Sequence, residues 1–415
     1  MSRRYLLVVI LAIILAGSLA SSRQYISIDA PEFRKIKVAV PEFATSKATG
    51  ANGLWFSQEI ANKLLLTGFV SIVDRTSDNS AITASAVELA ADFLVCGTIS
   101  PQGEISIVLL DTVNSAKLAT KSYPDSQQRP LATSRKIAAD IFSWLTGEQG
   151  PFDSRIVFVA AKKNHWEVRS VHFDGTDEQL LHTERHIIVA PFLSPNQRYL
   201  AFTSYAEGKP AVFIKDLVMG TVRKIAAHQG INVAGDWSRN SEEILFSASD
   251  GKGGEQIYRI GKDGRGKKKI TDTDGTNISP SWSPDNSKII FTANEYGTPQ
   301  IFVMEADGTN RQRRLGNSGY CTNPTWSPKG NLIAFENRIG GLLQICTVNE
   351  NGSNYRQLTA NDDDTRSPSW SPCGRFITFY IRNHGVFVMN FDGSNPRKIF
   401  SGDVRGVMWS KLLQH

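Results

Sequence analysis

The sequence predicts a multidomain protein in which a small α/β N-terminal domain is followed by an all-β six-bladed β-propeller. Three observations predict this fold class. A motif of the Trp-Ser-Pro type recurs through the C-terminal half, and Asp-Gly or Asn-Gly dipeptides punctuate the strand-like runs between its copies. Residues 21–150 lack the repeat and mix strand-like with helix-like segments. The 415 residues are enough for two or three domains.

The repeat has the length of a propeller blade. Each copy is followed by a strand-like run that ends in Phe, a second run, and a turn such as Asp307-Gly308, which favours a hairpin. A blade of about 40–45 residues typically contributes four strands, and we expect the Trp of each copy to fill the seam between blades. Successive serines of the motif are 44, 45, 44, 44 and 39 residues apart: Ser194, Ser238, Ser283, Ser327, Ser371 and Ser410.

The two ends of the repeat region are predicted to share one blade. The last copy, Trp409-Ser410, lies close to His415 and supplies a single inner strand. The runs 155–160, 167–173 and 179–181 supply the three outer strands from upstream. Five whole blades and this shared one make six, and closing the ring in this way removes free sheet edges.

The region before the propeller is predicted to be a separate α/β domain over residues 21–150, with the propeller over 151–415. Its second helix shows i, i+3, i+4 apolar spacing, and Gly147 to Pro151 punctuates the end of the domain. The predicted strands are 36–40, 69–73, 93–100, 105–113 and 117–123, and the predicted helices are 54–66 and 131–145.

Residues 1–20 have the pattern of a cleaved signal peptide. Arg3 and Arg4 precede an apolar run from Leu6 to Ala16, and small residues come before a cut at Ser21. The alternative, a membrane anchor, needs about 20 apolar residues. We therefore expect export, most simply to a bacterial periplasm, and no membrane-spanning segment after cleavage.

Composition and motifs exclude several function classes. The formal net charge of +6 is too evenly mixed for a dedicated nucleic-acid binder. No HExxH, GxSxG or P-loop motif occurs, so we expect no enzyme, no cofactor and no metal. The basic run Lys262–Lys269 on a hairpin tip is interpreted as a solvated rim, with anionic envelope polymers as the alternative. Asp362–Asp364 lacks the alternating spacing of a calcium site.

The cysteines and the mouth of the propeller leave two alternatives open. The spacing of the four cysteines does not match a zinc site, and we favour mostly free, buried thiols over disulfides: Cys96, Cys321, Cys346 and Cys373. The rival function is a periplasmic propeller enzyme acting on envelope glycans or peptides, which needs clustered carboxylates at the axial mouth. The segments expected at that mouth are mostly neutral, which disfavours an enzyme.

The order of segments along the chain resembles the TolB family, the periplasmic component of the Tol-Pal system. The resemblance implies the fold described above, no enzymatic activity, and a monomer that supports outer-membrane integrity and cell division. Its implied partners are the lipoprotein Pal, at the open face of the propeller, and TolA, at the N-terminal tail; other envelope proteins are further candidates. The matching segments are Tyr25–Asp29, Ile36–Phe43, Phe69–Arg75, Leu145–Gly147 and the Trp-Ser-Pro repeats.

The resemblance also implies partner-binding residues. The TolA-contacting tail alternates in a way that suits a strand added to a partner's sheet, with a plain edge strand as the alternative: Arg23, Gln24, Tyr25, Ile26, Ser27, Ile28 and Asp29. The Pal-binding face is placed on the loops that lead into the inner strands: Ile231, Asn232, Ala234, Asn277, Ile278, Ser279, Thr322, Asn323, Arg366 and Ser367. Two positions depart from the family pattern, since Ile231 stands where members often have His and Ile278 replaces a polar residue.

Overall fold

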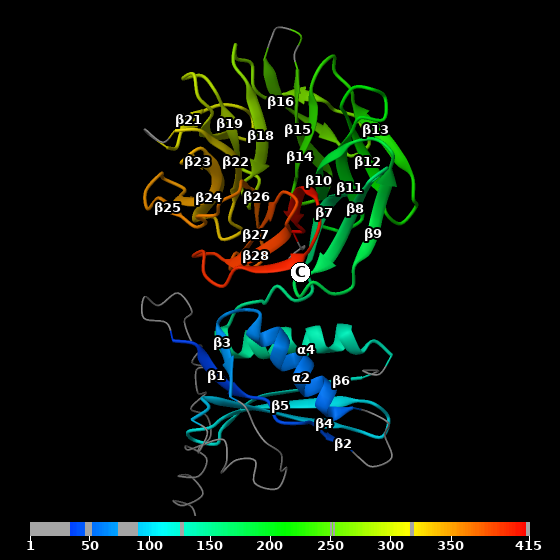
Figure 1. Ribbon diagram of the computed structural model, residues 1–415, viewed down its shortest axis with the longest axis vertical. Coiled ribbons are helices and arrows are strands. Elements are labelled where there is room, and N and C mark those ends of the chain that lie inside the picture. Colours follow the sequence, from blue (N-terminus) through cyan, green and yellow to red (C-terminus); the bar gives the residue numbers. More distant parts are fainter. Residues whose placement is uncertain are drawn as a thin grey trace, which may run out of the picture. The chain divides into compact units, whose positions relative to one another are not determined.

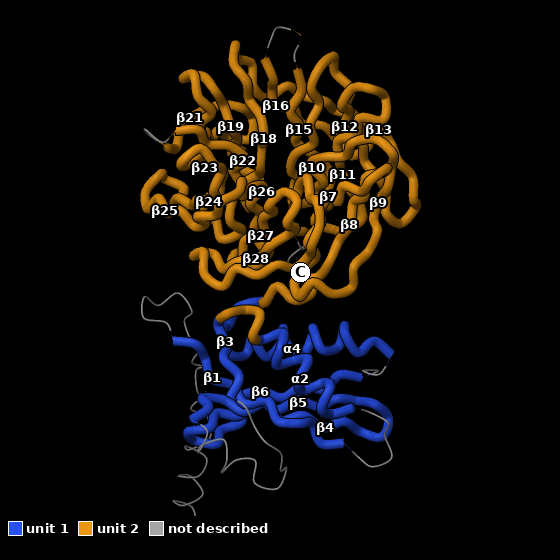
Figure 2. Tube along the Cα trace, viewed as in Figure 1, with its two compact units in different colours: residues 1–64, 69–149 blue, residues 65–68, 150–415 orange. Residues whose placement is uncertain are grey.

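The computed structural model describes residues 34–45, 52–73, 90–124, 128–249, 251, 254–315 and 319–411. The chain divides into two compact units, residues 1–64 with 69–149 and residues 65–68 with 150–415 (Figure 2). None of the described helices is long and apolar enough to cross a membrane. The predicted signal peptide lies outside the described residues.

The first unit contains a mixed sheet and two helices. The strand order is β3-β1-β4-β5-β6, with β2 paired to β4; β1 runs parallel to β3 and β4, and β5 is antiparallel to β4 and β6. Only the two-residue strand β2 was not predicted, because two exposed residues show no alternation. The elements are β1 (Ile36–Ala39), β2 (Ala44–Thr45), α2 (Gly53–Leu65), β3 (Val70–Ile72), β4 (Phe93–Ile99), β5 (Ile105–Asp111), β6 (Lys117–Tyr123) and α4 (Pro130–Thr146).

Local sequence sets both ends of helix α4. Pro130 occupies the first turn, where its missing N–H is not needed. Gly147 ends the helix at φ +74°, and its N–H donates to the carbonyl of Ser143 (2.8 Å). The helix buries its apolar stripe, including Ile141 and Phe142. This confirms the helix predicted from the i, i+3, i+4 spacing.

The second unit consists of six four-stranded antiparallel sheets (Figure 1), which confirms the predicted six-bladed propeller. Each blade runs outward from an inner strand. The blades are, in order, β10 (Ile188–Leu193), β11 (Tyr199–Ser204), β12 (Ala211–Asp216) and β13 (Val222–Ala226); β14 (Asn232–Trp237), β15 (Glu243–Ser249), β16 (Glu255–Gly261) and β17 (Lys268–Lys269); β18 (Asn277–Trp282), β19 (Lys288–Ala293), β20 (Gln300–Glu305) and β21 (Gln312–Arg313); β22 (Cys321–Trp326), β23 (Leu332–Ile339), β24 (Leu342–Asn349) and β25 (Arg356–Gln357); β26 (Thr365–Trp370), β27 (Phe376–Ile381), β28 (Gly385–Asn390) and β29 (Arg397–Phe400); and finally β30 (Val404–Trp409) with β7 (Arg155–Ala161), β8 (Trp166–His172) and β9 (Gln179–Glu184).

The sixth blade joins the two ends of the repeat region. Strand β30 pairs with β7, with Val404 opposite Ala160 and Trp409 opposite Ile156. The N–H of Ser410 donates to the carbonyl of Arg155 (2.8 Å), and the N–H of Arg155 donates to the hydroxyl of Ser410 (3.0 Å). The shared blade predicted from the repeat is confirmed.

The tryptophans of the repeat fill the seams between blades, as predicted. Trp237 is buried against Ala201 and Val212 of the preceding blade, and its indole N–H donates to the carbonyl of Phe192 (2.9 Å). Trp370 likewise donates across the seam to Thr325 (3.2 Å). A buried indole needs such an acceptor, so each of these contacts both packs and orients neighbouring blades.

Candidate functional site

The inner strands are irregular at the same place in all six blades. Each shows a register shift of the bulge type against its neighbour. In four blades a proline stands at the shift, and because proline lacks an N–H it cannot continue the ladder. The residues before these prolines are left-handed although none is glycine: Ala190 (φ 51°), Ser279 (φ 52°), Asn323 (φ 49°) and Ser367 (φ 52°). Such strained backbone is typical of functional sites.

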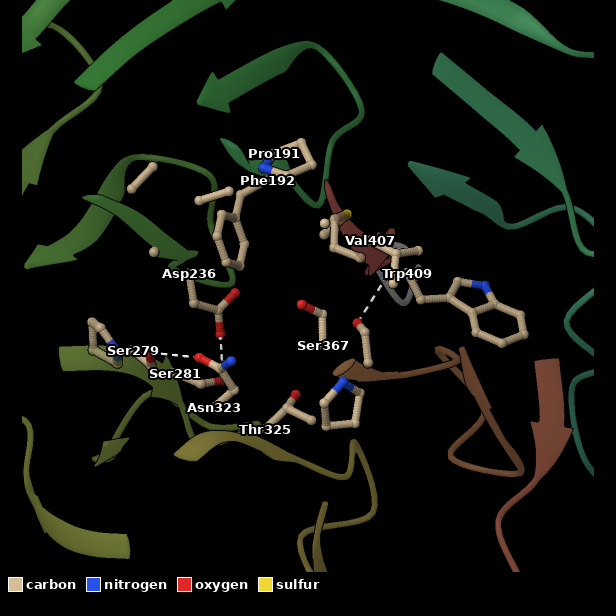
Figure 3. A pocket seen from close by; sticks show the side chains of 18 of the residues that line it. Pro191, Phe192, Asp236, Ser279, Ser281, Asn323, Thr325, Ser367, Val407 and Trp409 are labelled. Carbon is tan, nitrogen blue, oxygen red and sulfur yellow. Dashed lines mark hydrogen bonds between the residues drawn. The ribbon is translucent and has the colours of Figure 1, made fainter. Parts of the chain in front are cut away.

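The bulges surround a cavity of about 190 Å³ on the propeller axis, lined by all six inner strands (Figure 3). Backbone N–H groups at the bulges bond to side chains of the preceding blade. The N–H of Ala234 donates to Thr203 (2.8 Å), that of Ser367 to Glu336 (2.8 Å), and that of Trp409 to Ser369 (2.9 Å). The wall of the cavity is therefore held together from blade to blade.

A buried carboxylate, Asp236, lies in this wall and was not among the predicted site residues. It accepts from the Ser281 hydroxyl (2.9 Å), the Trp282 N–H (3.0 Å) and the Lys411 ammonium (2.5 Å). The sequence did contain a signal, because the residue before the Trp is Ser281, Thr325 or Ser369 in three other blades. With three donors bound, the Asp236 carboxylate is an inter-blade brace.

The structure divides the predicted Pal-face residues into two groups. Ala234, Ser279, Asn323 and Ser367 line the axial cavity, and the Ser279 hydroxyl donates to Asn323 (2.6 Å). Most of the segments predicted as loops are the first residues of strands β14, β18, β22 and β26. That prediction was wrong because the bulge interrupts the alternation that marks a strand.

The remaining predicted residues lie beside the cavity or beneath its rim. Ile231 is 43% exposed, and Ile278 is half-buried. Asn232 and Asn277 are fully buried; Asn232 accepts from the N–H of His228 (2.7 Å) and donates to Pro210 (3.0 Å). The two asparagine side chains therefore hold the loops in place instead of facing a partner.

The other two predicted residues also make local contacts. Thr322 is buried and its hydroxyl donates to Glu336 (3.0 Å). Arg366 lines a second pocket, of about 340 Å³, next to the axial cavity. Its guanidinium donates to Asp364 (2.6 Å).

This second pocket is charged, so the expectation of a mostly neutral mouth was wrong on this side. Its lining residues come from three neighbouring blades: Leu342, Asp363, Asp364, Arg366, Tyr380, Arg382, Asn383 and Arg405. The expectation failed because Arg382 and Arg405 lie outside the segments that were predicted to form the mouth. Burial raises the pKa of Tyr380 to about 12, with the Glu336 charge as a second cause, so its phenol stays protonated.

Opposing influences act on the pKa of Asp364. Burial acts to raise it, but the Leu343 N–H (2.8 Å) and the Arg366 guanidinium together lower it below its usual range. Asp364 is therefore an ionised partner of Arg366.

The predicted TolA-contacting tail, Arg23 to Asp29, lies outside the described residues. No disulfide joins any of the four cysteines, all of which lie in the described ranges. Cys321 and Cys346 are buried, whereas Cys96 and Cys373 are only half-buried. The expectation of mostly buried thiols holds for two of them.

Comparison with known proteins finds a matching family and similar proteins. A family model described as the TolB beta propeller domain matches residues 142–413. The chain is 34% identical over 226 residues to a Tol-Pal system protein TolB of Syntrophus aciditrophicus (strain SB), covering 49% of this chain and 50% of the relative. It is 30% identical over 293 residues to a Tol-Pal system protein TolB of Desulfosudis oleivorans, covering 65% of each. These matches therefore span half to 65% of the relatives' length.

A solved structure shares the fold over most of the chain. The crystal structure of TolB from Acinetobacter baumannii superposes with a TM-score of 0.79 at 23% identity, covering 91% of this chain and 97% of that one. At this identity the likeness speaks for the fold alone.

Proposed function

Since the chain belongs to the TolB β-propeller family, we propose that it is the periplasmic protein-binding scaffold of a Tol-Pal system. In this role it links TolA to the lipoprotein Pal, maintains outer-membrane integrity and supports cell division. It acts as a monomer and catalyses no reaction.

The observation that carries the proposal is the preformed axial mouth. Left-handed residues at the bulges are held by hydrogen bonds to the preceding blade: the Ser367 N–H donates to Glu336, and the Asn323 side-chain oxygen accepts from the Ser279 hydroxyl. A site that is already rigid loses little conformational entropy on binding. The half-buried Ile278 and the exposed Ile231 add apolar surface beside these polar groups, and a mixture of this kind is typical of protein interfaces.

The arrangement of acidic groups favours binding over catalysis. Asp236 is the one carboxylate among the residues that line the axial cavity, and three donors already bind it. Across the described ranges, no group of three or more His, Cys, Asp or Glu side chains is placed to hold a metal ion. A glycan-cleaving propeller typically needs two carboxylates that act together at the scissile bond.

Capture experiments with Pal from the same organism test the axial face. Residues 21–415 are immobilised, and Pal binding is measured for the wild type and for Ile278→Glu. We expect the charge to weaken binding at least tenfold. The matched control is Val218→Glu, since Val218 is 75% exposed and not part of the cavity lining. Equal binding by wild type and Ile278→Glu contradicts the proposed face, and no binding by the wild type contradicts the function.

A deletion of residues 21–30 tests the second partner. We expect it to abolish capture of TolA and to leave Pal binding unchanged, because the tail adds a strand to the TolA sheet. A deletion of the last four residues, 412–415, serves as the control, because it also shortens the chain but leaves residues 21–30 intact. Undiminished TolA capture by the 21–30 deletion shows that the tail is not the TolA site.

A further inference from the structure

The mouth of the axial cavity has two chemically different halves. One ring of equivalent positions lies on the inner strands near the bulges, four residues before the Trp of each repeat or, in the first blade, before Leu193. In the first three blades this ring is aliphatic and half-buried, in the fourth it is Thr, and in the last two it is Arg. In chain order the ring is Val189, Val233, Ile278, Thr322, Arg366 and Arg405.

The cationic half extends into the pocket of about 340 Å³, where Arg382 joins the two ring arginines. We name Arg366, Arg382 and Arg405 the arginine sector. Arg405 lines both this pocket and the axial cavity, so the two spaces adjoin. We propose that the arginine sector binds the carboxylate of an Asp or Glu side chain presented by the protein that occupies the mouth; this inference rests on the proposed function.

Two of the three arginines have donors left for a ligand. Arg382 is exposed and forms no ion pair with any residue that the structure describes. Arg405 is paired with Asp403 through Nη2 (2.8 Å), but its Nε is buried and has no hydrogen-bond partner in the described chain. The Arg405 side chain is 23% exposed, so an incoming carboxylate can reach its guanidinium.

The acidic residues of the pocket have contacts of their own, so their oxygens do not occupy the remaining donors of Arg382 and Arg405. Asp364 is bound by Arg366 and the Leu343 N–H, and Asp363 lies 3.2 Å from His384. Glu336, buried below the rim, accepts from Thr322, Asn323 and the Ser367 N–H. Among the described residues, these pairings leave the Arg382 guanidinium without an anion and the Arg405 Nε without a hydrogen-bond partner.

The chemistry of the sector suits a carboxylate in particular. A guanidinium presents its N–H groups in a planar fork that matches both oxygens of a carboxylate. The Tyr380 hydroxyl, which lines the same pocket, remains protonated and can donate as well. The aliphatic half of the ring then covers apolar surface next to the partner's acidic residue. A partner with this pairing of groups would be oriented as well as bound.

Calorimetric titration of the mature chain with Pal tests the inference. We expect Arg382→Glu to weaken binding by about 10- to 100-fold, and Arg405→Lys, which keeps the charge opposite Asp403, to weaken it about fivefold. The matched control is Arg356→Glu on strand β25, whose two residues are exposed at the outer edge of a blade; its affinity should stay within twofold of the wild type. Thermal melts establish that each variant is folded.

A charge swap separates direct contact from indirect effects. Each surface Asp and Glu of Pal is replaced in turn by Lys, and we expect one replacement to restore binding to Arg382→Glu while weakening binding to the wild type. If Arg382→Glu binds as tightly as the wild type while Ile278→Glu does not bind, the inference is wrong and the proposed function stands. If the wild type does not bind Pal, both are wrong.

Discussion

Replacing Trp409 by Ala tests whether the last strand holds the ring of blades closed. Trp409 is 1% exposed and stacks on Phe173 with ring centroids 5.9 Å apart. Its indole N–H donates to the Ser154 hydroxyl (2.7 Å). Phe173 and Ser154 belong to the upstream part of the propeller, so this one side chain joins segments about 250 residues apart in the sequence.

The expected cost follows from burial. Truncating a buried Trp to Ala lowers the free energy of unfolding by about 3–5 kcal/mol, and the lost hydrogen bond adds about 1 kcal/mol. We expect a total of about 5 kcal/mol. Trp409→Phe keeps most of the apolar contact and should cost about 2 kcal/mol by the same reasoning.

Urea unfolding together with hydrogen exchange provides the assay. Trp326→Ala is the control, because Trp326 is similarly buried but its indole bonds within its own blade, to Gly330 (3.1 Å). Both variants should lose stability. Only Trp409→Ala should raise the exchange rate of the β7 amides, by tenfold or more, because β30 is the neighbour of β7 in the ring. Equal protection of β7 in the two variants refutes the closure argument.

Three further outcomes follow from single contacts. Asp236→Ala should lower the free energy of unfolding in urea by about 2–4 kcal/mol, since it leaves the buried Trp282 N–H without its acceptor and Lys411 without its partner. Lys411→Met should cost about 1–3 kcal/mol, because it leaves the Asp236 carboxylate, which is 5% exposed, without a counter-charge. Hydrogen bonds from the Ser283 hydroxyl and the Ser287 N–H lower the pKa of Asp285 from 3.8 to about 2. The ionised Asp285 therefore stabilises the folded protein by about 1 kcal/mol after solvent screening. This stabilisation should be present above pH 4 and lost as the pH falls through 2. Asp285→Asn should show no such loss in acid urea titrations. Iodoacetamide at pH 8 should leave Cys321 and Cys346 unmodified in the native protein and modify both in urea. Both are buried, and burial raises the pKa of Cys346 to about 11. Rapid modification of Cys346 in the native protein contradicts this.

Much of the site was less predictable than the fold. Asp236 departs visibly from the Ser or Thr found at its repeat position, so a comparison of the repeats could have found it. Arg382 lies in the β27–β28 turn and Arg405 in the final strand, and no local pattern relates the two. Asn232 and Asn277 stand at the expected place in the sequence, but burial commits their amides to bracing loops.

The sequence by itself determined the blades and their closure. The repeat of about 44 residues, the Asp-Gly turns and the apolar runs are local properties of the chain. Five of the six blades form from contacts within one such unit, and the sixth joins the two ends of the repeat region. Only the tertiary structure decided what the mouth contains. The bulges and the circular arrangement of blades bring together side chains such as Lys411 and Asp236, which are 175 residues apart. Side-chain contacts of this kind depend on the geometry of the closed ring, which no short stretch of sequence encodes.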